Sequence, residues 1–445
     1  MEYVIVAAAA VALILLVRGC FQADTAWRVL PVLMLAFIIR LVTHVLVLRS
    51  GSLDYGGDNI GYELTAMEIV NYWKNDGFQF VSTEQVNSLY SAAVPCHVFA
   101  LVIYVCGGYA PLACTSLVAL LACAMCIVMY KFARLIGAEE RSAFRLLVLV
   151  AFVPAFLVHT SDMFKDGFNA FLVVACLGLA ASNVQRFDLR KIMLLLPLLW
   201  ALWHVRPYMV FMCAVPLLLG IVNPRHVLSL RLMLISVAAL VCAAVFVEEI
   251  TATAPATMMQ QELEQGQADN VRRSNASDDS GVVFDDGGNA WSRLGPKLVY
   301  TLLSPFPWMG GSMALQFGKL EALLLYYLLY CAARGARRLW NSDRRMLLLL
   351  LLFIVPGTIA YATTMANIGL IFRQRIPIVM VISLLAAIAW NRAPVRSPAA
   401  DEPADEPAGT PTGGHTRGPA TRGAVPGPAP VGSARPGAAA PPPAP

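Results

Sequence analysis

Long apolar runs alternate with short polar segments along most of this sequence of 445 residues. The runs lie at residues 3–17, 30–48, 111–130, 146–160, 167–184, 192–204, 207–222, 232–247, 319–333, 346–360 and 376–390. A straight transmembrane helix needs about 20 apolar residues, so the shorter runs require longer true boundaries, tilt or a locally thin bilayer. The pattern predicts an all-α polytopic membrane protein with about 11 transmembrane helices.

The distribution of Lys and Arg predicts which helix ends share a side of the membrane. Basic residues gather at Arg18/Arg28, Lys131/Arg134/Arg141/Arg145, Arg186/Arg190/Lys191, Arg225/Arg231 and Arg334/Arg337/Arg338/Arg344/Arg345. Cytoplasmic loops carry such an excess, so we expect these groups inside and the net acidic segments 50–91 and 248–297 outside. The assignments agree if the apolar run 92–106 is a juxtamembrane or re-entrant piece that does not cross fully. The N-terminus is then extracytoplasmic and the C-terminus cytoplasmic.

The same reading divides the chain into a membrane domain and a tail. Residues 1–392 form the transmembrane domain, with two large extracytoplasmic loops at 50–110 and 248–318. Beyond Trp390 the chain consists mainly of Ala, Pro and Gly with scattered charges. Such a composition has no apolar face to bury, so residues 393–445 are expected to be a disordered cytoplasmic tail.

Composition supports a membrane protein and favours no other class. The chain is 58% hydrophobic and 14% charged, with a mean hydropathy of +0.64 and a formal net charge of +5. The basic residues follow the topology, and no nucleic-acid motif accompanies them, so the expected partner is the lipid bilayer and not a nucleic acid. Cys123 and Cys126 form a C-x-x-C pair within an apolar run, where packing explains them better than metal binding.

An acidic segment between residues 52 and 76 interrupts the apolar pattern. Asp58 follows the flexible pair Gly56-Gly57, and apolar residues then recur at helical spacing from Ile60 to Trp73. This pattern predicts a short helix along the membrane surface, with carboxylates presented at its start. The segment is either a site for chemistry on a lipid-attached substrate or a solvated connector.

Three further turns on the expected outer side carry charges. They are His159–Asp166, with Asp162, Lys165 and Asp166; Trp203–Tyr208, with Arg206; and Asn367–Pro377, with Arg373 and Arg375. Arginine on the outer side opposes the positive-inside bias, and an anionic partner such as a lipid phosphate would explain it. The alternatives are arginines that reach lipid headgroups and a local ion pair between Asp162 and Lys165.

The order and side of these motifs resemble the GT-C fold of membrane glycosyltransferases, in particular bacterial members of exopolysaccharide and cell-envelope assembly. The resemblance covers residues 25–390. It is carried by Gly57-Asp58-x-x-x-Tyr62-x-x-x-Ala66, Pro154…Ser161-Asp162…Lys165-Asp166, Arg206-Pro207-Tyr208, Pro305-Phe306-Pro307-Trp308 and Asn367-x-Gly369…Arg373-x-Arg375-x-Pro377. One additional N-terminal span departs from that fold.

The resemblance implies an inverting transfer of a sugar from a polyprenyl-phosphate-linked donor to a glycan, lipid or protein acceptor on the extracytoplasmic face. Asp58 would be the general base, with Asp54 as its competitor and Glu63 as a weaker one. The residues implied in substrate and phosphate binding are Tyr62, Lys165, Arg206, Arg373 and Arg375. Asp162 and Asp166 would hold a divalent cation or orient the acceptor, and no other cofactor is expected.

Three other functions remain open on the sequence. A polysaccharide polymerase would differ in donor and acceptor alone. A transporter or flippase for a lipid-linked glycan would need charged groups within the membrane, and Arg40 and His44 are the candidates. A non-catalytic scaffold for envelope assembly would use the tail for interactions.

Overall fold

The computed structural model describes residues 1–50, 57–83, 85–89, 92–210, 212–213, 216, 264, 267–270, 272, 284, 289–310, 313–364 and 367–392. These residues are predominantly helical and contain no β-strand. The tail 393–445, Asp54, and most of the predicted spans 207–222 and 232–247 lie outside the described residues.

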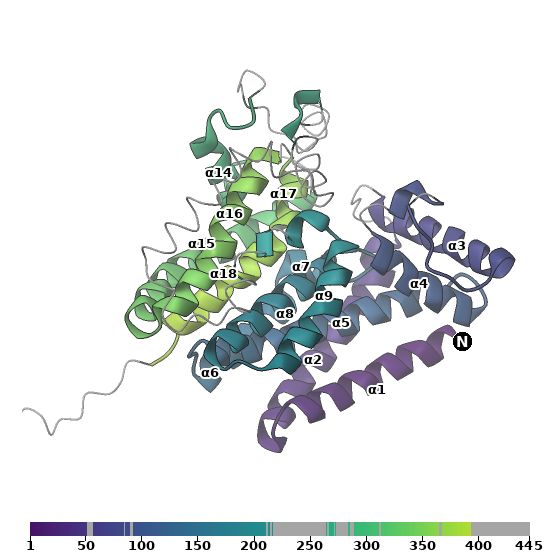
Figure 1. Ribbon diagram of the computed structural model, residues 1–445, viewed down its shortest axis with the longest axis horizontal. Helices are drawn as coiled ribbons and strands as arrows, with labels where there is room; N and C mark the ends of the chain where they lie inside the picture. The colour runs from purple at the N-terminus through teal and green to yellow at the C-terminus, as the bar shows by residue number, and fades with distance from the viewer. Residues whose placement is uncertain are drawn as a thin grey trace, which may run out of the picture. The chain divides into compact units, whose positions relative to one another are not determined.

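The helices follow one another along the chain as labelled in Figure 1. Their bounds are α1 Glu2–Cys20, α2 Ala23–Thr43 with a π-helical continuation His44–Leu48, α3 Asp58–Asp76, α4 Ala93–Cys106, α5 Pro111–Leu135, α6 Glu140–Phe152, α7 Pro154–Val158, α8 Asp166–Gln185, α9 Leu189–Trp203, α14 Leu294–Leu303, α15 Met313–Ser342, α16 Arg344–Thr364, α17 Ile368–Gln374 and α18 Ile376–Ala389.

Among the described residues, five helices are long and apolar enough to cross a membrane: α1, α2 with its continuation, α5, α8 and α16. They coincide with five of the predicted spans, and they support a membrane-embedded, all-α protein. The predicted total of 11 spans is not confirmed. The helices α4 and α18 have 14 residues each, which at 1.5 Å per residue reach about 21 Å, short of a bilayer core of about 30 Å.

The predicted span 146–160 is divided in two. Helix α6 ends at Phe152 and α7 begins at Pro154. Proline lacks a backbone N–H and disfavours a helical conformation in the residue before it, and Val153 accordingly has extended-type angles of φ −57° and ψ 124°. The break matters because α7 leads directly into the charged turn His159–Asp166.

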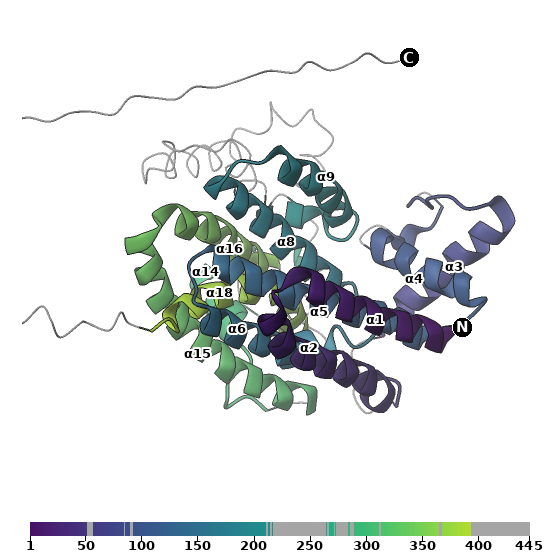
Figure 2. The same ribbon diagram turned by 90° about the horizontal axis from the view of Figure 1, so that it is seen from below.

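Side-chain contacts sort the helix ends into two groups. At the end that contains Asp58, Glu2 Oε1 accepts hydrogen bonds from the backbone N–H groups of Leu112 and Ala113, at 2.7 and 3.2 Å. This contact places the starts of α1 and α5 at the same end, as the alternation of basic and acidic loops predicts. Figure 2 shows α1 beside α2 and α5.

The opposite end carries the arginine-rich segments. Arg338 Nη1 donates to the carbonyl of Ala389 at 2.8 Å, and Gln185 Nε2 donates to the carbonyl of Leu135 at 2.8 Å. Asn391 Nδ2 donates to the carbonyl of Gly137 at 2.9 Å. The described basic groups predicted to share the cytoplasmic side thus lie at one end, and the charged turns lie at the other.

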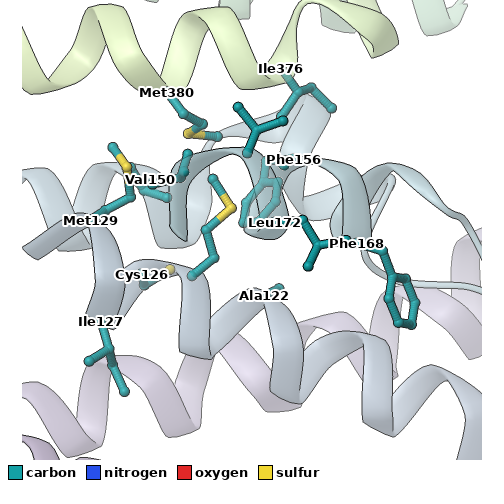
Figure 3. Packing of buried hydrophobic residues seen from close by; sticks show 14 of the residues in the cluster. Ala122, Cys126, Ile127, Met129, Val150, Phe156, Phe168, Leu172, Ile376 and Met380 are labelled. Carbon is teal, nitrogen blue, oxygen red and sulfur yellow. The ribbon is translucent and has the colours of Figure 1, made fainter. Parts of the chain in front are cut away.

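Between the two ends, α5, α6, α7, α8 and α18 meet in an apolar core. Figure 3 shows Met129 of α5, Val150 of α6, Leu172 of α8 and Met380 of α18 together, with Phe156 of α7 among them. These side chains are fully or almost fully buried. Close packing of this kind fixes the positions of α7 and α8, and it thereby fixes both ends of the turn that connects them.

Candidate functional site

Six residues that the sequence singled out gather at the Asp58 end and form what we call the Asp166 cluster. Its members are Asp58, Tyr62, Lys165, Asp166, Arg206 and Arg373. Arg206 Nη2 lies 2.7 Å from Asp166 Oδ1, and Arg373 Nε lies 2.8 Å from Asp166 Oδ2. Arg373 also reaches across to Asp58, with Nη1 2.5 Å from Oδ2. Asp166 therefore lies between two guanidinium groups, and Arg373 bridges two carboxylates.

Four separate parts of the chain supply these side chains. Gly57 has a positive φ of 74°, a conformation that glycine adopts without penalty, and α3 begins directly after it with Asp58. Asp166 is the first residue of α8, Arg206 precedes a short helical segment that begins at Pro207, and Arg373 lies in the last turn of α17. The bend and the helix predicted for this acidic segment are both confirmed.

Gly167 allows α8 to start close to the preceding turn. A Cβ atom at this position would lie 2.9 Å from Thr160 Cγ2, closer than real side chains approach. The absence of a side chain thus lets the turn fold back on the first residues of α8. This close approach keeps Lys165 and Asp166 beside the end of α7.

Lys165 and Tyr62 complete the cluster on the α3 side. The Lys165 ammonium lies 5.7 Å from the centre of the Tyr62 ring, within cation–π range. Burial, together with the positive charge of Arg206, lowers the pKa of Lys165 to about 7, against the opposing effect of Asp166. Burial and the charge of Asp166 raise the pKa of Tyr62, which stays protonated. Lys165 is therefore the one cation of the cluster whose charge can change near neutral pH, because arginine keeps its proton.

The cluster has more positive than negative groups and incomplete hydrogen bonding. Among the described residues, three cationic side chains face two carboxylates here. Arg206 Nε, Arg373 Nε and Asp166 Oδ2 are buried without an aligned hydrogen bond, although the last two atoms are close. Arg206 has one further partner, the hydroxyl of Tyr208, to which Nη1 donates at 2.7 Å. Such a site has capacity for an added anion.

Asp162 is not part of this cluster. It is fully buried in a second group, the Asp162 cluster, formed by His44, Arg49, Asn59, Glu63 and Asp162. Arg49 Nη2 lies 2.8 Å from Glu63 Oε2 and 3.1 Å from Asp162 Oδ1. Asn59 Nδ2 donates to Asp162 Oδ2 at 2.8 Å.

Both oxygens of Asp162 are fully engaged. Oδ1 also accepts from the backbone N–H of Met163 at 2.8 Å and lies 3.4 Å from His44 Nδ1. Burial opposes ionisation of this carboxyl, but the hydrogen bond from His44 and the charge of Arg49 hold its pKa below the usual value. The predicted local ion pair between Asp162 and Lys165 is absent from the described contacts, because Asp162 turns toward Arg49 instead.

Arg375 also points away from the Asp166 cluster. Its Nη1 donates to the carbonyls of Ser304 and Thr301, at 2.6 and 3.3 Å, at the end of α14. Burial lowers its pKa to about 10, against the opposing charge of Glu321. Of the three arginines implied in phosphate binding, Arg206 and Arg373 thus lie together at Asp166, while Arg375 anchors the segment that precedes Pro305.

The described residues contain no group of three or more His, Cys, Asp and Glu side chains that could hold a metal ion. Asp162 and Asp166 lie in different clusters, and their oxygens face arginines. In the part of the chain that the structure describes, these two carboxylates thus do not combine into one donor set for a divalent cation, and guanidinium groups face their oxygens.

Sequence reasoning missed Arg49 and Asn59, and it named Tyr208 in the motif Arg206-Pro207-Tyr208 without assigning it a role. Arg49 directly follows the predicted span 30–48 at its outer end, so the argument applied to Arg206 would have found it. Asn59 lies next to Asp58 and carries no signal of its own, and the motif does not tell what Tyr208 contacts. Asn59 contacts Asp162, which lies more than 100 residues away along the chain. Tyr208 contacts Arg206 within the same local turn.

No family model matches the chain, and no curated protein or solved structure matches it either.

Proposed function

We propose that this protein is a membrane-embedded glycosyltransferase that takes a sugar from a lipid-phosphate carrier. The observation that carries the proposal is the Asp166 cluster, where Arg206, Arg373 and Lys165 meet Asp58 at the end of apolar helices. A lipid-linked phosphate combines an apolar tail with an anionic head, and such a site offers both surroundings. The GT-C resemblance assigns the same residues to the same task.

In this reaction an acceptor hydroxyl oxygen attacks the anomeric carbon of the sugar. The bond from that carbon to the phosphate oxygen breaks, and its electron pair stays on the departing lipid phosphate. Arg206, Arg373 and the Lys165 ammonium stabilise the charge that grows there. Asp58 accepts the proton of the hydroxyl as general base.

The pairing of Asp58 with Arg373 adds a condition to this mechanism. Asp58 Oδ2 lies 2.5 Å from Arg373 Nη1, so this oxygen faces a guanidinium and not an incoming hydroxyl. A bound phosphate competes for Arg373, and the loss of this partner frees Asp58 Oδ2 to face the acceptor hydroxyl. Donor binding would then activate the base at the moment when it is needed.

The contacts of Arg40 and His44 do not favour a transporter. Arg40 Nε donates to Thr160 Oγ1 at 2.8 Å, and His44 Nδ1 lies 3.1 Å from Thr115 Oγ1. Both residues support the turn His159–Asp166 and are buried. A polymerase that uses the same cluster differs in its substrates alone, and it belongs to the same proposal.

We also propose that the Asp58 end is extracytoplasmic. The support is the arginine excess at the opposite end, which the positive-inside bias assigns to the cytoplasm. Membrane-impermeant labelling of single cysteines tests the sidedness, with Glu68→Cys on α3 and Arg337→Cys on α15 in a background without native thiols. Labelling from outside is expected at position 68, and labelling at position 337 instead would reverse the orientation.

The activity is tested with purified protein in nanodiscs and a panel of polyprenyl-phosphate sugars. Release of polyprenyl phosphate, measured by mass spectrometry, is expected with at least one donor. Arg206→Met and Arg373→Met should abolish it, and Lys74→Met, which removes an exposed cation from α3, should not. Binding of farnesyl methyl phosphate, a singly charged phosphodiester, is measured in parallel. If neither arginine variant weakens this binding and no donor is cleaved, the proposal fails.

A further inference from the structure

Beside the cation–π contact of Tyr62 with Lys165, charged and amide side chains tie the first two turns of α3 to the rest of the molecule through two separate sets of ion pairs and hydrogen bonds. Asp58 pairs with Arg373 of α17, and we call this the Arg373 lock. Asn59, the next residue, donates to Asp162. One turn further along α3, Glu63 pairs with Arg49, and Arg49 also pairs with Asp162. These three contacts form the Arg49 lock. Both locks hold the same helix, but their partners lie in different elements.

The two locks differ in their exposure to solvent. The side chain of Asp58 is 43% exposed, whereas Glu63 and Asp162 are 9% and 0% exposed. Charges near the surface are screened by water and salt, and buried pairs are screened much less. The carboxylate of the Arg373 lock is therefore the one that water, salt or a competing anion can displace, although Arg373 itself is 10% exposed and Arg49 24%.

The Arg49 lock is anchored to α2 and to the turn that carries Lys165 and Asp166. Arg49 directly follows the π-helical continuation of α2, and Asp162 lies in the turn. Arg40, two turns earlier on α2, holds the same turn through Thr160 at 2.8 Å. The Arg49 lock thus connects α3, which carries Asp58, to the turn that carries Asp166.

These contacts acquire a function when an anion binds. A phosphate that binds Arg373 displaces Asp58 from it. Of the two locks, the Arg49 lock alone then holds the start of α3. We propose that Arg49 is a positioning residue that holds α3, and with it Asp58, against the turn His159–Asp166 while a bound anion occupies Arg373. This inference rests on the proposed function for the identity of the anion, but the existence of two locks does not.

The two locks can be tested without any substrate. Spin labels are attached through p-acetylphenylalanine at exposed positions 68 on α3 and 308 after α14, with the native cysteines retained. Double electron–electron resonance then gives the distance distribution between α3 and the rest of the helices. We expect a single narrow peak in the parent protein, in Arg49→Met and in Arg373→Met. The double variant Arg49→Met/Arg373→Met should lose this peak, and an unchanged narrow peak would overturn the positioning role.

The same labels test the anion step. Farnesyl methyl phosphate should leave the parent distribution narrow and broaden that of Arg49→Met, because the probe replaces the Arg373 lock. If the probe binds without broadening Arg49→Met, the inference is overturned while the anion site stands. If the probe does not bind at all, the proposed function fails together with the anion step.

Kinetics separate positioning from binding. With an active donor, Arg49→Met should reduce turnover at saturation by about 10- to 100-fold and change the donor KM by less than about twofold. Arg49→Lys should restore part of the turnover, because an ammonium can face one carboxylate but not bridge two. Lys74→Met is the matched control on α3. An Arg49→Met variant that raises the donor KM with normal turnover would place Arg49 at the donor instead.

Discussion

Asp162 and Asp166 stand four residues apart, and both face arginines, yet their hydrogen-bonding surroundings differ. Asp162 is fully buried, and both of its oxygens have hydrogen-bond donors from Arg49, Asn59 and the Met163 backbone. Asp166 is also buried, but it faces two arginines, and one of its oxygens lacks an aligned hydrogen bond.

The difference separates a structural group from a candidate reactive one. In the Asp162 cluster, two carboxylates balance one arginine and the polar atoms of Asp162 are satisfied, while one buried atom, Arg49 Nε, lacks an aligned hydrogen bond. In the Asp166 cluster, three cations face two carboxylates, and three buried atoms lack an aligned hydrogen bond. Unsatisfied buried groups cost free energy, so they persist where a ligand or a reaction uses them.

The strongest test of this comparison replaces Asp58 and its neighbour Asn59 one at a time. Asp58→Asn should lower sugar transfer by about 10²–10⁴-fold, because the amide cannot accept the proton of the hydroxyl. Asn59→Ala, which touches the Asp162 cluster alone, should reduce transfer much less. Both are measured as initial rates of polyprenyl phosphate release. Full activity in Asp58→Asn would remove this residue from the mechanism.

A second test separates the two arginines that flank Gln374. Arg373→Met should weaken phosphodiester binding or transfer by about 10²–10³-fold, through loss of one charge at the phosphate. Arg375→Met should leave binding nearly unchanged and lower the melting temperature, because it uncaps the end of α14. Calorimetric binding and thermal unfolding are compared for the two variants. Equal losses of binding would return Arg375 to the phosphate site.

A third test addresses the stability of the Asp162 cluster. Asp162→Asn removes the charge that faces Arg49 and places an amide N–H₂ opposite a donor. We expect a loss of about 1–3 kcal/mol in the free energy of unfolding, the usual effect of removing a hydrogen bond to a charged group. Phosphodiester binding should be retained in the folded fraction. A strong loss of binding with unchanged stability would show that Asp162 serves the ligand directly.

The smallest expected effect is a pH dependence of anion binding. The Lys165 pKa of about 7 means that the ammonium is present below this pH and lost as the pH rises through it. The affinity for farnesyl methyl phosphate should therefore fall by up to about tenfold between pH 6 and pH 8. Lys165→Arg keeps its charge, so its affinity should stay constant over this range. An equal fall in both would assign the titration to another group.

Several features of the fold followed from local pattern. The five long apolar helices, the bend at Gly57 and the helix α3 arise from short-range hydrophobicity and backbone preference, which the sequence displays directly. The break at Pro154 is equally local, but the apolar run concealed it. The prediction that the arginine-rich segments share one end of the helices followed from the alternation of basic and acidic loops alone.

The partners of the charged side chains did not follow from pattern. By itself, the sequence determined a helical chain with several helices long and apolar enough to cross a membrane, since those properties depend on composition and spacing. The tertiary structure decided that Asp162 faces Arg49, that Arg375 turns to Ser304, and that Arg206 and Arg373 share Asp166. Ion pairs form across distances of a few ångströms, and which residues come that close depends on how helices far apart in the sequence pack together.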